Sequence, residues 1–124
     1  MRQAKRAGGF SPQFLAEIKK LLLGQEKRLV KEKEQVAKED PYLDPERSSA
    51  KIAEIEEAAS EEIGHERVEA EKGVLERILA GTRLALTKLK RRKYGICENC
   101  GRRIDPARLK AFPQARLCLD CKGR

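Results

Sequence analysis

The chain has 124 residues and a formal net charge of +8, with 39% charged residues, 4% aromatic residues and no tryptophan. This composition excludes a thick globular core and is typical of long amphipathic helices. No run of about 18 apolar residues is present, which excludes a membrane-spanning helix, and the basic start MRQAKRAGGF lacks the apolar segment of a secretory signal. We therefore expect a cytoplasmic protein, in which paired cysteines bind metal more often than they form disulfides.

The charge is distributed unevenly along the chain. Residues 88–124 carry 12 Lys and Arg against 3 Asp and Glu, whereas residues 39–71 carry 3 basic residues against 12 acidic ones. Two segments of opposite sign predict two surfaces with different partners. Solvated helix faces would give the same composition, so charge alone leaves both interpretations open.

The first predicted element is a helix over about residues 12–38. Residues 1–11, which precede it, are expected to be a flexible basic segment. Ser11 followed by Pro12 is typical of a helix N-cap and first helical position. The apolar residues that recur at helical spacing are Phe14, Leu15, Ile18, Leu21, Leu22, Leu29 and Val36. The helix should end before Pro41, because a residue that precedes proline avoids helical backbone angles.

The next segment, KEDPYLDPERSS, predicts a turn near residues 40–50, because it holds two prolines and several acidic residues. A second helix can begin at Asp44, Ser48 or Ser49 and should run to about residue 92. Its apolar stripe is predicted to be Ile52, Ile55, Ala59, Ile63, Ala70, Val74, Ile78, Ala85 and Leu89. Antiparallel pairing with the first helix would cover both stripes. Three glycines mark either close helix approach or bending: Gly64, Gly73 and Gly81.

The four cysteines form two pairs, Cys97 with Cys100 and Cys118 with Cys121, and 17 residues separate the pairs. Two residues between the members of a pair let both thiolates face one ion, so two pairs complete a tetrahedral site. Gly101 supplies the backbone freedom that such a knuckle needs. We expect one structural zinc ion, since all four thiolates are used and no coordination position stays open. Iron fits the same spacing, and disulfides or free thiols are the alternative without metal.

Together these elements predict a mainly α fold, in which a long antiparallel two-helix coiled-coil hairpin is followed by a small four-cysteine zinc-finger module. The hairpin should span residues 12–93 and the module residues 94–124, where Asp105 and Pro106 can begin a short helix. No nucleophile–base pair and no phosphate-binding loop is recognisable, so no enzyme is expected. The only histidine, His65, is expected on a helix surface.

A basic run lies at the junction of the hairpin and the module and consists of Lys88, Lys90, Arg91, Arg92 and Lys93. These side chains can complement the carbonyl end of the long helix. They can also form a basic partner surface that contacts phosphates.

The carboxyl-terminal stretch YGICENCGRRIDPARLKAFPQARLCLDCKGR, preceded by a helical hairpin, resembles the DksA/TraR family of bacterial transcription regulators. The resemblance covers about residues 12–124. It rests on the CENCG knuckle, on the LCLDC segment and on Tyr94, Gly95, Ile96, Ile104, Arg108, Leu109, Ala111, Pro113 and Ala115. It implies a zinc module with a coiled-coil hairpin that binds RNA polymerase directly. The hairpin of such a protein enters the secondary channel of the polymerase and changes promoter complexes without sequence-specific DNA binding.

The family carries acidic residues at the tip of its hairpin, in the pattern D-x-x-D-x-A. The matching residues here are Glu54, Glu57 and Ala59, with Glu in place of both aspartates. Asp40 and Asp44 form a second candidate pair. They resemble the family's D-P-x-D motif and lie nearer the predicted turn. Carboxylates at the end of a thin hairpin can approach a catalytic magnesium or the basic walls around it.

Some family members share a ppGpp site with the polymerase. Asp120 and Lys122 match that site, but Gly81 and Phe112 stand where basic residues would be expected, so we expect no ppGpp dependence. Three functions remain open. The first, which we favour, is a monomeric polymerase-binding regulator. The second is a zinc-ribbon protein with non-specific, salt-sensitive nucleic-acid binding. The third is a coiled-coil adaptor that pairs with another helix.

Overall fold

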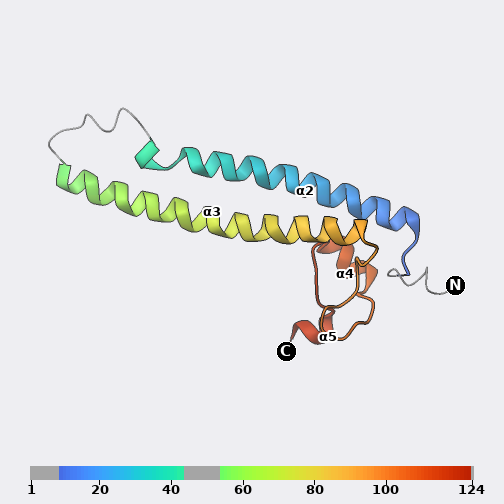
Figure 1. The fold of residues 1–124 in the computed structure, drawn as a ribbon. Helices are drawn as coiled ribbons and strands as arrows, with labels where there is room; N and C mark the ends of the chain where they lie inside the picture. The colour runs from blue at the N-terminus through green and yellow to red at the C-terminus, as the bar shows by residue number, and fades with distance from the viewer. Residues whose placement is uncertain (1–8, 44–53, 124) are drawn as a thin grey trace. The chain divides into compact units, whose positions relative to one another are not determined.

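The computed structural model describes residues 9–43 and 54–123 (Figure 1). In chain order the elements are the helix α2, Pro12–Lys38, the short 3-10 helix η1, Pro41–Leu43, and the helices α3, Glu54–Lys90, α4, Pro106–Ala111, and α5, Leu119–Lys122. In the described ranges the strand-like pairing is one isolated antiparallel bridge between Ile96 and Arg103. The prediction of a mainly α fold is confirmed. None of the described helices is long and apolar enough to cross a membrane.

The ends of α2 follow the local signals in the sequence. The Ser11 hydroxyl accepts a hydrogen bond from the Phe14 amide at 3.1 Å, which is the predicted N-cap. The helix ends at Lys38, before Pro41 as expected. The long helix α3 is described from Glu54 onward and ends at Lys90. The predicted starts of that helix, at Asp44, Ser48 and Ser49, lie outside the described residues.

The chain forms two compact units, and each contains part of both long helices. The first unit comprises residues up to Lys27 and from Ala80 onward, and the second comprises Arg28–Leu79. In the first unit, α2 and α3 are joined by a 2.7 Å hydrogen bond from Gln25 Nε2 to Thr82 Oγ1. They are also joined by a 2.8 Å ion pair between Arg83 and Glu26.

In the second unit the pairing shows the direction of the helices. Lys33 pairs with Glu76 at 3.3 Å, and Glu39 pairs with Arg67 at 3.3 Å. The residue number rises on one side of these pairs as it falls on the other. The two chain segments are therefore antiparallel in this unit, as the sequence predicted.

One hydrophobic core joins the base of the hairpin to the cysteine module within the first unit. Ile18 and Leu22 of α2 are fully buried together with Ile104 and Leu109 of the module. Tyr94 is also buried in this core, and its hydroxyl donates to the Pro113 carbonyl at 2.6 Å, while burial raises the pKa of Tyr94. The module therefore shares its core with the hairpin.

The residues just before α2 also contact the module. The Phe10 ring stacks on Phe14, with ring centroids 5.1 Å apart, and lies directly against Gly95. The Arg103 guanidinium lies 4.9 Å from the centroid of the Phe10 ring and donates to the Gly9 carbonyl at 3.1 Å. The expected flexible segment extended to residue 11. Residues 9–11 are instead held by α2 and the module, and residues 1–8 lie outside the described residues.

The buried residues of α3 match the predicted stripe only in part, and Ala85 is buried as predicted. Val68, Leu79 and Thr82 are buried, whereas the predicted stripe residue Ile63 is 68% exposed and Val74 is 46% exposed. The spacing of apolar residues in α3 therefore does not by itself determine which of them are buried. Burial of Thr82 is tolerated because its hydroxyl oxygen accepts a hydrogen bond from the Gln25 side chain. A polar residue of this kind cannot be recognised as core from apolar spacing.

Candidate metal centre

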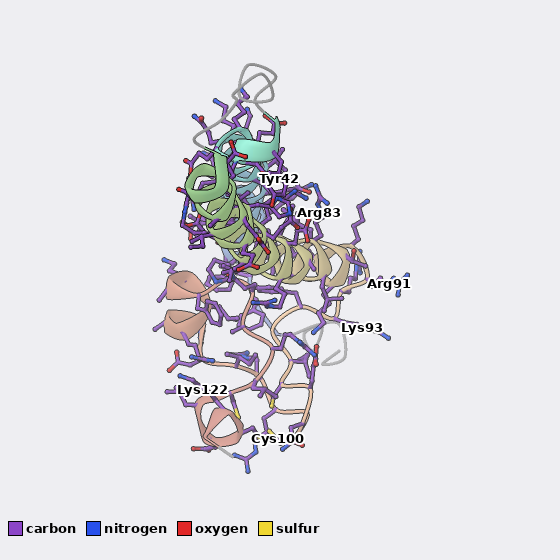
Figure 2. All side chains as sticks on the ribbon, turned by 90° about the vertical axis from the view of Figure 1, so that its left-hand side faces the viewer. Tyr42, Arg83, Arg91, Lys93, Cys100 and Lys122 are labelled. Atoms are coloured by element: carbon purple, nitrogen blue, oxygen red, sulfur yellow. The ribbon has the colours of Figure 1, made fainter. Side chains whose placement is uncertain are left out.

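The four cysteines meet in one cluster, whose Sγ atoms all lie within 4.8 Å of one another. None forms a disulfide, and the Sγ atoms of Cys100 and Cys118 are 3.8 Å apart. A tetrahedral zinc ion with Zn–S bonds of about 2.3 Å sets its sulfurs about 3.8 Å apart. Figure 2 shows sulfur atoms gathered beside Cys100, at the end of the module that also carries α5. The predicted ligand set is therefore brought together at a separation that suits zinc.

The first cysteine pair lies in a tight knuckle. The Gly101 amide donates to the Cys97 carbonyl at 3.0 Å, and Gly101 has a φ of 77°, which explains the glycine that the sequence places there. The amides of Asn99 and Cys100 point at Cys97 Sγ, at 3.4 Å and 3.5 Å. The Asn99 side chain donates to Cys121 Sγ at 3.2 Å. These donors stabilise negative charge on the sulfurs, which is the form that binds metal.

The second pair is positioned by two short helices. The Asp105 carboxylate accepts a hydrogen bond from the Ala107 amide at 2.9 Å, and Pro106 is the first residue of α4, so the predicted helix start is confirmed. Cys118 is the N-cap of α5, and Cys121 lies within that helix. This one-turn geometry directs both thiols toward the first pair.

The surroundings of the sulfurs shift the pKa values of two thiols in opposite directions. The Cys100 amide lowers the pKa of Cys97 to about 6. The Asn99 amide favours the Cys121 thiolate, but burial and the neighbouring thiols outweigh it and raise the pKa of Cys121 to about 11. Four thiolates this close can ionise together only when a cation shares the site. A closed set of four sulfurs fits a structural zinc ion and leaves no position for catalysis.

Glu98, inside the first knuckle, links the metal centre to α3. It forms an ion pair with Lys88 of α3, and Arg116 donates to its carboxylate at 2.9 Å and 3.1 Å. The hydrogen bonds from Arg116 and then from Lys88 lower the pKa of Glu98 to about 2. This contact could not be predicted from the sequence, because the three residues are far apart in the chain and no local pattern marks them as partners.

The basic run ends α3 with an unusual residue. Arg92 has a φ of 60°, its amide donates to the Leu89 carbonyl at 3.2 Å, and the Lys93 amide donates to the Lys88 carbonyl at 2.9 Å. This is a Schellman cap, in which glycine is the usual residue. The side chains of Arg91 and Lys93 project outward from the end of the helix (Figure 2). Lys88 is occupied by Glu98, which leaves Lys90, Arg91, Arg92 and Lys93 as the exposed part of the predicted basic surface.

The acidic tip candidates occupy different environments. Asp40 is 7% exposed, its Oδ1 accepts the Tyr42 amide at 3.0 Å, and its Oδ2 lies 2.7 Å from His65 Nδ1. Glu54 and Glu57 belong to the first described turns of α3, and Ala59 is exposed there. Asp44 lies outside the described residues. His65 is half-buried, on the face of α3 that contacts Asp40.

Comparison with known proteins identifies the cysteine module. Residues 92–124 match the family model of the prokaryotic dksA/traR C4-type zinc finger. The "RNA polymerase-binding transcription factor DksA" of Escherichia coli (strain K12) is 49% identical over 37 residues, which is 30% of this chain and 24% of that protein. Its counterpart in Buchnera aphidicola is 44% identical over 39 residues, covering 32% of this chain and 26% of that protein. The matched segments thus span about a quarter of these relatives.

The whole fold also has a solved counterpart. The structure of the transcription factor DksA2 from Pseudomonas aeruginosa matches 98% of this chain and 87% of that chain, with a TM-score of 0.79 and 25% sequence identity. The zinc-finger match assigns zinc, rather than iron, to the four-cysteine site. Residues 92–124 therefore match the DksA/TraR C4-type zinc finger, and the resemblance of the chain to the DksA/TraR family is confirmed.

Proposed function

We propose that this protein is a DksA-like transcription regulator that binds bacterial RNA polymerase directly and acts by binding rather than by catalysis. The observation that carries the proposal is the fold match to a transcription factor over 98% of the chain, together with the zinc finger. The relatives named as RNA polymerase-binding share that module. The proposal places the protein in the cytoplasm, where the polymerase works.

We further propose that the protein acts as a monomer and that the loop end of its hairpin enters the secondary channel of the polymerase. The acidic character of residues 39–71, with 12 acidic against 3 basic residues, supports a contact with basic channel walls. No sequence-specific reading of DNA is required, and the exposed basic residues at the end of α3 are available for non-specific phosphate contacts.

Of the acidic candidates, we assign the working contact to Glu54 and Glu57. The environment of Asp40 supports this choice, because its carboxylate is buried and already accepts hydrogen bonds from the Tyr42 amide and from His65. Contact between Asp40 and a partner would require breaking these hydrogen bonds, which costs free energy.

Charge neutralisation tests the proposal. The double substitution Glu54→Gln and Glu57→Gln should leave binding to RNA polymerase nearly unchanged and abolish the effect on promoter-complex lifetime, because the module and the hairpin base are untouched. The matched control is Glu32→Gln with Glu34→Gln, which removes two exposed charges from α2 and should retain the effect. Binding is measured by co-purification with purified polymerase, and lifetime by in vitro transcription.

A second pair of substitutions separates the nucleic-acid alternative. Arg91→Gln with Arg92→Gln should preserve the effect on promoter complexes under the proposal. If this variant is inactive while the Glu54 and Glu57 variant is active, or if the zinc-loaded protein does not bind polymerase at all, the proposed function is wrong.

A further inference from the structure

Outside the cysteine centre, three side chains with metal-binding chemistry come together in the second unit. They are Asp40, His65 and Glu69, and one ligand atom of each lies within 4.8 Å of the others. His65 and Glu69 are four residues apart on α3, so they share one face of the helix. Asp40 reaches them from the residues just after α2. The set therefore draws on two segments that are 25 residues apart in the sequence.

The aspartate and the histidine ring are already held in place. Asp40 is 7% exposed, and the Tyr42 amide fixes its Oδ1 at 3.0 Å. The Tyr42 ring stacks on the His65 ring, with centroids 4.3 Å apart and planes 18° apart. Gly64 allows this approach, because a Cβ there would lie 2.9 Å from Pro41 Cγ. An ion would therefore meet two ligands whose conformational freedom is already restricted.

The surrounding charge favours a cation. Burial raises the pKa of Tyr42, and the nearby carboxylates of Glu62, Glu61, Asp40 and Glu66 raise it further. Lys72 opposes this field, since it acts on Asp40 and pairs with Glu69 at 3.5 Å, and it would have to release Glu69. An exposed pair of this kind contributes about 1 kcal/mol or less. The binding free energy of a divalent ion held by an imidazole and two carboxylates exceeds the contribution of that ion pair.

We propose that Asp40, His65 and Glu69 form a second metal site, for a divalent ion of the kind that imidazole and carboxylate bind together, such as Zn²⁺, Co²⁺ or Ni²⁺. The ion takes the place of the hydrogen between His65 Nδ1 and Asp40 Oδ2, and the neutral ring then carries its proton on Nε2. These atoms are 2.7 Å apart, whereas two ligands about 2.1 Å from a tetrahedral zinc lie about 3.4 Å apart. The contact must therefore open by a few tenths of an ångström, and water completes the coordination.

Cobalt added to the zinc-loaded full chain tests this site. Equilibrium dialysis should give one Co²⁺ per chain beyond the zinc in the cysteine centre. Its spectrum should show d–d bands without the thiolate-to-cobalt charge-transfer band that a four-cysteine site would produce. In NMR spectra the bound Co²⁺ should shift the ring signals of His65 first.

The variants Glu69→Gln and His65→Gln should each weaken Co²⁺ binding at least tenfold, an order of magnitude typical for loss of groups that support a metal. Glu69 is exposed, so its substitution leaves the core intact. The matched control Glu71→Gln removes the same charge two residues away and should bind Co²⁺ like the wild type.

Two results would overturn the second site. One is Co²⁺ binding that is equal in the wild type and the His65→Gln variant, which would mean diffuse attraction to an acidic surface. The other is the appearance of the thiolate band, which would mean that cobalt only displaces zinc from the cysteines. The site does not depend on polymerase binding, so either outcome leaves the proposed function standing.

Discussion

Glu98 and Arg116 form a two-pronged ion pair, in which the guanidinium donates to both carboxylate oxygens of Glu98 at 2.9–3.1 Å. Lys88 of α3 contacts the same carboxylate. One acidic residue beside the first metal ligand thus holds together the knuckle, the second half of the module and the end of the long helix. Arg116 is 58% exposed, so solvent weakens the pair.

Replacing Glu98 with Gln should lower the free energy of unfolding by about 1 kcal/mol, since the carboxylate takes part in a small network rather than in a single exposed pair. Urea unfolding of the zinc-loaded protein, followed by circular dichroism, measures the change. Glu17→Gln is the control, because Glu17 pairs with Lys110 at 3.6 Å and both side chains are mostly exposed. Equal losses in the two variants would show that Glu98 has no special role.

Leu109 connects the module to the hairpin base, and truncating it should be costly. Its side chain is fully buried in the core that includes Ile18 and Leu22. Leu109→Ala should therefore destabilise the first unit by about 2–5 kcal/mol. Leu119→Ala, at a position that is 63% exposed, should change stability by less than about 0.5 kcal/mol. Similar urea midpoints for the two variants would contradict the shared core.

Removing zinc should unfold the module and loosen the hairpin base with it. A chelator should release one zinc ion per chain from the cysteine centre, and amide exchange at Ile104 and Leu109 should accelerate, because metal binding supplies much of the folding energy of such modules. Exchange at Ile18 and Leu22 should accelerate as well, since they share the core. Returning zinc should restore protection. Unchanged exchange at Ile104 after zinc release would contradict the account.

Asp40 should titrate below its usual pKa of 3.8. Burial alone would raise the pKa of Asp40, but hydrogen bonds from the Tyr42 amide and from His65 lower it. The stabilisation that the carboxylate provides is therefore complete above pH 3.8 and is lost as the pH falls through the lower, folded-state pKa.

The amide signal of Tyr42 in NMR spectra reports this titration directly. Its chemical shift should change with a midpoint below 3.8, the usual pKa of an aspartate. Asp40→Asn should remove the transition. A wild-type midpoint at or above the usual value would show that the two hydrogen bonds do not form in solution.

Local signals in the sequence predicted what depends on neighbouring residues. Ser11 before Pro12, Asp105 before Pro106 and the glycine after the first knuckle all behave as expected. These motifs work because the donor and the acceptor lie within a few residues of each other. The two cysteines of each pair are also close in the sequence, so their spacing predicted the metal site. The metal supplies the constraint that brings the two distant pairs together.

Long-range pairing could not be predicted in this way. Asp40 meets His65 across 25 residues, and Gln25 meets Thr82 across 57, with no local pattern to mark either pair. The predicted stripe of α3 was right at Ala85 but wrong at Ile63 and Val74, which have the right spacing and are exposed. Arg92 in a left-handed cap had no signal either, since glycine is usual there.

Photo-crosslinking tests whether the loop end of the hairpin engages RNA polymerase. A photoreactive residue is placed at Glu57 in one protein, at Tyr42 in a second and, as a control, at exposed Lys19 of α2 in a third. Each zinc-loaded protein is mixed with bacterial RNA polymerase. We predict crosslinks from Glu57 to the secondary channel or the catalytic loops, weaker ones from Tyr42, and none there from Lys19. Crosslinks only to DNA, or none from a folded protein, would contradict this prediction.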